Sequence, residues 1–415
     1  MRSSDWKLNP TTVIRPNFEI TPARPGTEYF QVMSSTHNST FDTQTMARAL
    51  QLARLGQYSA MPNPHVGCVL IRDGHIIGEG FTQPSGGNHA EIEALQAAGD
   101  ARGATAYVTL EPCSHSGKTG PCAHALIEAG ISRVVVAMRD PNPLVAGAGL
   151  EKLRQAGIEV SCGLLETEAR EVIPGFVARM TRGRGRVRAK LAMSLDGRTA
   201  MANGESQWIT GPAARADVQR LRAMSCAIVT GIGTVLADDC ALSVRPDELA
   251  MANEEARRAC QRQPIRAVLD SSLQTPPGAR VLQGEQATIL FHSGANPVPP
   301  ALMETRAEYE EISVHASASA NKGLDLVDML NVLNARQCNE ILVESGPRLA
   351  GALLQLGLLD ELIVYMAPTL MGDRARPLLA LPLDAMSDKV ALHIEDVRRV
   401  GQDWRFTVIP QNRKG

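Results

Sequence analysis

Four residues of this 415-residue sequence have the types and spacing of a metal-dependent hydrolytic site. His89 and Glu91 are separated by one residue, whereas Cys113 follows a proline and precedes Cys122 by nine positions. One imidazole and two thiolates suit zinc and leave a fourth tetrahedral position for water. Zinc lowers the pKa of that water, and Glu91 is placed to pass its proton to a departing amine. The set predicts a zinc deaminase that acts on a pyrimidine-like ring.

The spacing of the two cysteines distinguishes this site from that of nucleic-acid deaminases. Their signature is H-x-E followed by P-C-x-x-C, whereas this sequence has eight residues between Cys113 and Cys122. Two alternatives remain. In the first, the cysteines and His89 are buried structural residues. In the second, the zinc is structural and takes a fourth ligand from His115 or His124.

The segments around these residues predict a layered α/β domain. Asp42 is a candidate N-cap for an amphipathic helix, and Asp73-Gly74 is a hairpin turn between two apolar runs. Helical and strand-like segments then alternate. The predicted helices are Ala90–Ala98, Ala123–Ala129 and Leu150–Ala156, and the predicted strands are Val66–Ile71, Ile76–Phe81, Ala104–Leu110, Arg133–Met138 and Ile158–Cys162.

A second α/β domain is predicted beyond an arginine-rich segment. Residues Thr181–Arg188 contain two glycines among four arginines, which is typical of a solvated connector. We expect an extension at 1–41 that is disordered, a deaminase domain at 42–183 and a second domain at 184–412, with a charged helix or loop at Asp247–Arg262. Its predicted strands are Val187–Ala192, Ala227–Thr230, Ile265–Leu269, Ala287–Phe291, Glu340–Glu344 and Leu362–Ala367, and its helices Ala213–Met224, Leu324–Ala335 and Leu349–Leu356.

Composition and charge limit the classes of partner that the protein is expected to bind. A formal net charge of −2 gives no basic face for nucleic acid, and no apolar run approaches the length of a membrane span. Eight cysteines are too few for a disulfide scaffold of this size, and no secretory signal is recognisable. We expect a cytoplasmic homo-oligomer that binds a small-molecule substrate, neither nucleic acid nor a membrane.

Motifs throughout the chain resemble those of the RibD family of bifunctional riboflavin-biosynthesis deaminase/reductases. The resemblance extends from about Asp42 to about Pro410. Its motifs are Pro62-Asn-Pro-His-Val-Gly67, His89-Ala-Glu91, Thr109-Leu-Glu-Pro-Cys-Ser-His115, Asp140-Pro-Asn-Pro143, Ser194-Leu-Asp-Gly-Arg-Thr199, Ser206-Gln-Trp208, Thr234-Val-Leu-Ala-Asp-Asp239 and Glu344-Ser-Gly-Pro347.

The resemblance implies the fold and two successive reactions. A cytidine-deaminase-like three-layer α/β domain would use zinc to deaminate 2,5-diamino-6-(5-phosphoribosylamino)pyrimidin-4-one. A dihydrofolate-reductase-like domain would then use NADPH to reduce the ribosyl group of the aminouracil product to ribityl. A single-function nucleobase or tRNA deaminase with a non-catalytic second domain is an alternative, and so is a nucleotide-binding module without catalysis.

The resemblance also implies roles for individual residues. His89, Cys113 and Cys122 would hold zinc, and Glu91 would be the catalytic proton shuttle. Lys190 is a candidate for reductase catalysis. The substrate would contact Asn63, Lys118, Ser206, Arg222, Leu242, Arg245 and Glu344. NADPH would contact Ala192, Trp208, Thr234, Asp238, Ser271, Gly346, Pro347, Arg348, Leu349, Ala350, Gly351 and Ala352.

Two positions depart from the family pattern. Cys240 stands where proline is general, which removes a restraint on the loop after Asp239. Thr82 replaces a histidine, so no substrate-contacting imidazole is expected there.

Overall fold

The structure is a computed structural model that describes residues 40–114, 120–143, 145–315 and 323–411. The expected extension at 1–41 lies outside these residues except for its last two, which begin helix α1 (Thr40–Leu55). Asp42 is therefore not the N-cap. It lies in the first turn, is buried, and accepts hydrogen bonds from Tyr107 (2.5 Å) and Arg133 (2.9 Å).

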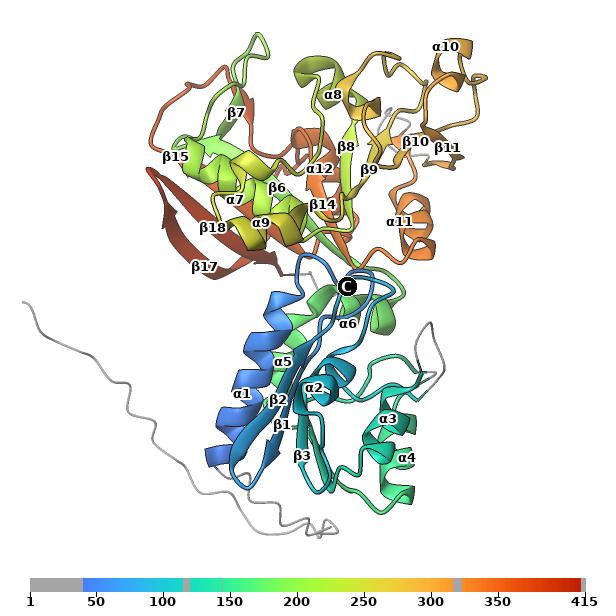
Figure 1. Ribbon diagram of the computed structural model, residues 1–415. Helices are drawn as coiled ribbons and strands as arrows, with labels where there is room; N and C mark the ends of the chain where they lie inside the picture. The colour runs from blue at the N-terminus through green and yellow to red at the C-terminus, as the bar shows by residue number, and fades with distance from the viewer. Residues whose placement is uncertain (1–39, 115–119, 144, 316–322, 412–415) are drawn as a thin grey trace, which may run out of the picture. The chain divides into compact units, whose positions relative to one another are not determined.

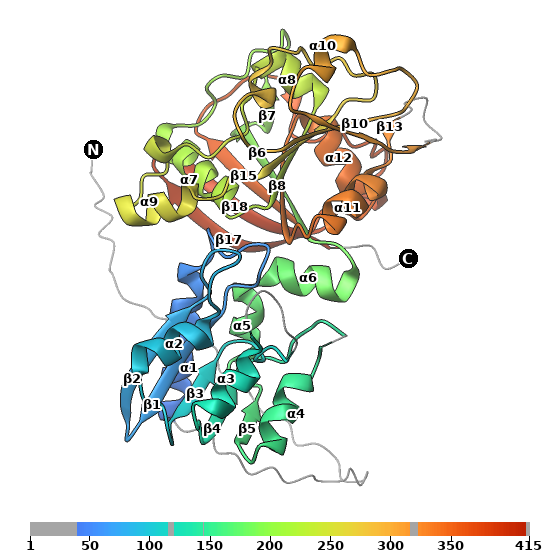
Figure 2. The same ribbon diagram turned by 45° about the vertical axis from the view of Figure 1, so that its right-hand side comes forward.

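A five-stranded sheet with helices on both faces forms the first half (Figure 1). Its order is β2-β1-β3-β4-β5, in which β1 runs antiparallel to both neighbours and β3, β4 and β5 are parallel. The strands are β1 (Gly67–Arg72), β2 (His75–Phe81), β3 (Thr105–Val108), β4 (Arg133–Val136) and β5 (Glu159–Cys162). Helices α1 and α5 cover one face, and α2, α3 and α4 the other (Figures 1 and 2). The remaining helices are α2 (Ala90–Ala98), α3 (Cys122–Glu128), α4 (Ala148–Gln155), α5 (Glu166–Val172) and α6 (Pro174–Arg182).

Two glycines bring helices directly against this sheet. A Cβ atom at Gly80 would lie 2.3 Å from the carbonyl oxygen of Ala90, and one at Gly67 would lie 1.9 Å from that of Ala49. These positions therefore exclude any side chain. The backbone of helix α2, which follows His89 and carries Glu91, therefore packs directly against the backbone of β2.

A nine-stranded sheet organises the second half, in the order β11-β10-β9-β8-β14-β6-β15-β18-β17. The seven strands from β11 to β15 are mutually parallel, and β18 and β17 add an antiparallel hairpin. The strands are β6 (Arg186–Ser194), β8 (Ala227–Gly231), β9 (Ile265–Leu269), β10 (Thr288–His292), β11 (Glu308–Glu311), β14 (Glu340–Glu344), β15 (Glu361–Ala367), β17 (Leu392–Val400) and β18 (Asp403–Pro410).

Helices cover both faces of this sheet, because its central strands are apolar on both sides. Ile228 and Leu342 face one core cluster with α7, whereas Val229 and Val343 face another with α11 and α12. The helices are α7 (Pro212–Ala223), α8 (Ile232–Asp238), α9 (Asn253–Cys260), α10 (Pro300–Met303), α11 (Leu326–Ala335) and α12 (Pro347–Gln355). Two further sheets have two short strands each: β7 (Arg198–Ala200) pairs with β16 (Arg376–Pro377), and β12 (Val314–His315) pairs with β13 (Gly323–Leu324). Single turns of 3-10 helix lie at Pro246–Glu248, Arg280–Leu282 and Met386–Asp388.

The prediction of a solvated arginine-rich connector is confirmed for Thr181, Arg182 and Gly183, which are exposed, and is wrong for residues 186–188. Strand β6 begins at Arg186, within that segment, and Arg188 is buried and lies 3.1 Å from Glu340. Arg184 binds Asp360 at 2.6 Å. The arginines are bound by acidic residues far along the sequence, a pairing that local composition does not reveal.

Among the described residues, no helix combines the length and apolar character that crossing a membrane requires.

Candidate functional site

Three side chains converge near the starts of α2 and α3. His89 is the N-cap of α2, Cys122 is the first residue of α3, and Cys113 lies in the loop that follows β3. His89 Nδ1 lies 3.3 Å from Cys122 Sγ and 3.7 Å from Cys113 Sγ. In a tetrahedral zinc site with ordinary Zn–N and Zn–S lengths, ligand atoms lie roughly 3.6 Å apart. The donor set and its spacing therefore fit zinc.

The thiol of Cys113 is prepared to lose its proton. A hydrogen bond from Cys122 lowers its pKa, and so does the contact with His89. The backbone N–H of Cys122 also points to Cys113 Sγ at 3.3 Å. Thiolates are the form that ligates metals. The cluster thus favours the charge state that a cation requires.

Glu91 lies beside this cluster and is buried, with 4% of its surface exposed. Burial, together with the negative charge of Cys113, raises the pKa of Glu91 to about 7. A carboxyl group with a pKa near neutrality can both accept and return a proton. Glu91 therefore has the chemical properties of a proton shuttle.

Glu111 fixes the loop that carries Cys113, a role that the sequence analysis missed. Its buried carboxylate accepts backbone N–H hydrogen bonds from residues of a second loop and from the start of α4. The donors and distances are Asp140 (3.1 Å), Gly147 (2.9 Å), Gly149 (2.9 Å) and Leu150 (3.4 Å). The signal in the sequence is an acidic residue directly before Pro112, just after the apolar run that ends at Leu110.

The other residues expected in the deaminase site have different outcomes. Asn63 is partly buried in the loop before β1, and its N–H donates to Ala60 O at 3.1 Å. Lys118 and His115 lie outside the described residues. His124 lies 3.3 Å from Glu128 and is exposed, so it does not complete a four-ligand site. Thr82 is buried and accepts the Val66 N–H at 2.9 Å, a structural role.

In the second half, three charged residues expected in the reductase site lie together. Arg222 donates to Glu344 through Nε at 2.6 Å and Nη2 at 2.8 Å, and through Nη1 to Ser243 O at 3.1 Å. Lys190 is the register partner of Glu344 on the adjacent strand. Burial lowers the pKa of Lys190, and the Glu344 carboxylate partly offsets this effect. The arrangement is a partly buried Arg222–Glu344 ion pair with a second cation, Lys190, on the adjacent strand.

The residues expected to contact NADPH are arranged by the sheet. Thr234 and Asp238 follow β8, Ser271 follows β9, and Gly346 follows β14, and these three strands are adjacent and parallel. Ligands of open α/β sheets bind beyond the carboxyl ends of such strands. Gly346 is also the N-cap of α12, where free backbone N–H groups suit a phosphate. The order of the strands thus brings these residues together beyond the carboxyl ends of β8, β9 and β14.

Several other expected contacts are less accessible or already paired. Leu242 is 2% exposed and Ala350 is fully buried, while a Cβ at Gly351 would lie 2.4 Å from Ala380 O. Arg245 binds Glu248 at 2.6 Å. The α12 segment therefore presents Gly346, Pro347, Arg348, Leu349 and Ala352 more openly than its two buried residues.

The remaining expected residues lie on β6 and in the segment before α7. Trp208 is 71% exposed, with the Arg215 guanidinium 4.6 Å from its ring. Ser206 is partly buried two residues before it, and Ala192 is partly buried on β6. Cys240 follows Asp239, whose φ of 41° marks a tight turn at the end of α8. The turn forms here without proline.

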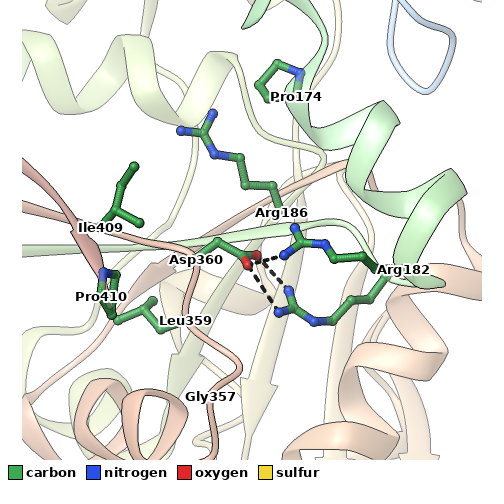
Figure 3. Close-up of a pocket in the computed structure, with 9 residues that line it drawn as sticks. Pro174, Arg182, Arg186, Gly357, Leu359, Asp360, Ile409 and Pro410 are labelled. Carbon is green, nitrogen blue, oxygen red and sulfur yellow. Dashed lines mark hydrogen bonds and ion pairs between the residues drawn. The ribbon is translucent and has the colours of Figure 1, made fainter. Parts of the chain in front are cut away.

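A separate pocket of about 330 Å³ contains none of the expected residues (Figure 3). Arg182 and Arg184 both bind Asp360 there, at 2.7 and 2.6 Å. Its wall also includes Pro174, Arg186, Gly357, Leu359, Ile409 and Pro410. Because Asp360 already binds both arginines, this pocket is not a ready anion site.

Comparisons with known proteins identify the family. Residues 39–138 match the cytidine and deoxycytidylate deaminase zinc-binding region, and residues 186–406 match the RibD C-terminal domain. Riboflavin biosynthesis protein RibD of Escherichia coli K12 is 50% identical over 370 residues, which cover 87% of this chain and 97% of that protein. The chain belongs to the RibD family. The Haemophilus influenzae RibD is 45% identical over 90% of this chain and 98% of its own.

Solved RibD structures share the fold over about nine tenths of this chain. Form 1 of Acinetobacter baumannii RibD is 44% identical, has a TM-score of 0.82 and covers 90% of this chain and 99% of its own. A Thermotoga maritima diaminohydroxyphosphoribosylaminopyrimidine deaminase/5-amino-6-(5-phosphoribosylamino)uracil reductase is 32% identical, with a TM-score of 0.76, and covers 89% and 99%.

These matches confirm the predicted fold class and the prediction of a bifunctional RibD enzyme of riboflavin biosynthesis. The chain carries a zinc-binding deaminase domain and a reductase domain, so the single-function alternative is not supported. The His89, Cys113 and Cys122 group supports zinc as the metal, and a reductase domain calls for a nucleotide cofactor.

Proposed function

We propose that this RibD enzyme deaminates 2,5-diamino-6-(5-phosphoribosylamino)pyrimidin-4-one and then reduces the ribosyl group of the product with NADPH. The convergence of His89, Cys113 and Cys122 beside the buried Glu91 is the observation that carries the first step. The collection of Thr234, Asp238, Ser271 and the start of α12 at one sheet edge supports the second.

In the proposed deamination, His89, Cys113 and Cys122 hold zinc, which supplies Lewis acidity that lowers the pKa of water at the site. Glu91 accepts the water proton and returns it to the departing amine, so that ammonia leaves. Asn63 offers one donor and one acceptor to the ring edge. Lys118 is proposed to contact the substrate phosphate.

In the proposed reduction, NADPH supplies two electrons. We propose that Lys190 and Glu344 hold and move the single proton that the reaction also requires, and that Arg222, which binds Glu344, orients it. Ser206, Leu242 and Arg245 complete the proposed substrate contacts. Ala192, Trp208 and the accessible part of 346–352 complete those to NADPH.

A paired assay tests both steps. Purified enzyme given the diaminopyrimidine should release ammonia first and oxidise NADPH afterwards. Glu91→Gln should retain zinc while the rate of ammonia release falls about 10²- to 10⁴-fold, and NADPH oxidation with the aminouracil supplied should persist. Absence of both activities in the wild type would refute the assignment, whereas robust deamination of an oligonucleotide would favour the alternative.

We also propose that the enzyme is a cytoplasmic homo-oligomer that binds neither nucleic acid nor a membrane. All eight cysteines are free, as in a reducing compartment. Edge strand β17 and its neighbour β18 expose Leu392, Ile394, Val397, Trp404 and Ile409. A second copy would cover this apolar edge. Sedimentation should give more than one chain per particle, and fractionation should recover the enzyme with the cytosol.

A further inference from the structure

The loop that precedes β1 is buried in the reductase half of the chain. Tyr58 is 5% exposed and belongs to an apolar cluster with Val244, Leu249 and Ala259. Met61 is 4% exposed and belongs to the core that surrounds α11 and α12. This loop is part of the deaminase half in sequence, but its apolar side chains fill cores of the reductase.

Asn339 holds the backbone of this loop. Asn339 is 3% exposed, and both polar atoms of its side chain form hydrogen bonds. Nδ2 donates to the carbonyl oxygen of Pro62 at 2.7 Å, and Oδ1 accepts from Nε of Arg179 in α6 at 2.6 Å. Buried polar groups that are fully paired in this way fix one arrangement of the segments they join.

The packing around Asn339 leaves little room for movement. A Cβ atom on Gly175 of α6 would lie 2.4 Å from the backbone oxygen of Asn339. That same oxygen accepts the N–H of Arg186, where β6 begins. Asn339 directly precedes β14, the central strand of the nine-stranded sheet.

The segment that Asn339 holds leads into the deaminase site. Asn63 follows Pro62 directly, and the chain then enters β1 at Gly67. Strand β1 pairs with β3, which leads into the loop of Cys113. The carbonyl that Asn339 binds is therefore one residue from the proposed ring contact.

We propose that Asn339 is a positioning residue for deamination, which fixes Asn63 against the pyrimidine from within the reductase domain. The inference rests on the deaminase activity and the role of Asn63 proposed above. A loop held before substrate arrives needs no ordering on binding, so the hydrogen bond lowers the cost of forming the complex. The positioning needs residues of both domains, because Asn339 belongs to the reductase domain and Asn63 to the deaminase domain.

Two substitutions separate the two hydrogen bonds of Asn339. Asn339→Asp keeps an acceptor for Arg179 but places a carboxylate oxygen against the Pro62 carbonyl. Arg179→Met removes the other bond and leaves the Pro62 contact in place, so it is the matched control. Asn339→Ala, which removes both bonds, is the second variant.

Steady-state deamination of the diaminopyrimidine is then measured for each variant, with zinc content and with NADPH oxidation on supplied aminouracil as checks of an intact fold. Both Asn339 variants should raise the KM for deamination about 2- to 10-fold, the worth of one hydrogen bond. Their deaminase kcat, zinc content and reductase kinetics should match the wild type. Arg179→Met should leave the KM unchanged.

Two results would overturn the inference. One is a wild-type KM in both Asn339 variants. The other is an equal rise in Arg179→Met, which would mean that Asn339 serves general stability. A wild type that releases no ammonia would instead overturn the proposed function.

Discussion

Arg222 and Glu344, both expected to contact substrate, bind each other through two hydrogen bonds of 2.6 and 2.8 Å. Their contact joins the last turn of α7 to the carboxyl end of β14, next to Lys190. Glu344 is thus the counter-ion of Arg222, and its charge also acts on Lys190.

Glu344→Gln is expected to abolish most NADPH oxidation and to lower the free energy of unfolding by about 3 kcal/mol, because Arg222 then loses its counter-ion and Lys190 loses a neighbouring negative charge. Urea unfolding and NADPH oxidation measure the two effects. Arg222→Met should cost a similar amount. The double variant should cost less than the sum of the two single changes, and strict additivity would show that the pair is not coupled.

Cys113→Ser is expected to lose zinc and to slow ammonia release by more than about 100-fold, because a hydroxyl is a poor zinc ligand. Metal analysis and the ammonia assay measure these losses, and a chelator should reproduce them in the wild type. Cys162→Ser is the control, since Cys162 is an exposed thiol outside the cluster. NADPH oxidation should continue in both variants; equal zinc in the two would contradict the ligand assignment.

Glu111→Gln is expected to weaken zinc binding about 10-fold without altering a ligand, since an amide cannot accept all four N–H groups that the carboxylate accepts. Competition with a zinc indicator measures the affinity. Gly149→Ala should also weaken zinc binding, from the first turn of α4, because its Cβ would lie 2.0 Å from Pro112 O. Gly278→Ala, which meets open space, should bind zinc like the wild type.

Asp217 is expected to make stability depend on pH in acid. Burial opposes its ionisation, but the hydrogen bond from Tyr365 at 2.6 Å and the charges of Arg405 and Arg220 outweigh this and hold its pKa below the ordinary value. A depressed carboxyl pKa stabilises the fold above about pH 4, and that contribution is lost as pH falls through the folded pKa.

Asp217→Asn should therefore lower the unfolding free energy at pH 7 by about 2 kcal/mol. The difference from the wild type should shrink between pH 5 and pH 3, as urea titrations would show. A difference that stays constant over this range would mean that packing, not charge, accounts for the loss.

Local patterns predicted the elements that carry the site. The Asp73-Gly74 turn joins β1 and β2 as expected, and the six strands expected in the second half are all present within a few residues of their predicted bounds. These segments are strongly apolar or end in turn residues, so their neighbours in sequence decide their structure. The helical alternative for Asp247–Arg262 is realised by α9.

Long-range pairing could not be predicted in the same way. Strand β17 contains no buried residue, so no apolar alternation marks it, and it exists because it pairs with β18. The arginines near residue 184 find Asp360 and Glu340 only after folding. Glu111 and Asn339 were likewise missed as positioning residues, since their partners lie far away in the sequence or are backbone groups.

The burial of Tyr58 and Met61 has a consequence for protein engineering. Dividing the gene near codon 183 would give two open reading frames, but each protein product would lack part of the core packing of the intact chain. The amino-terminal product would expose the side chains of Tyr58 and Met61, which are buried in the intact chain. The carboxy-terminal product would have a cavity at each of the two positions that these side chains fill. Separating the activities requires a redesigned loop with polar replacements at both positions and filled cores in the other half.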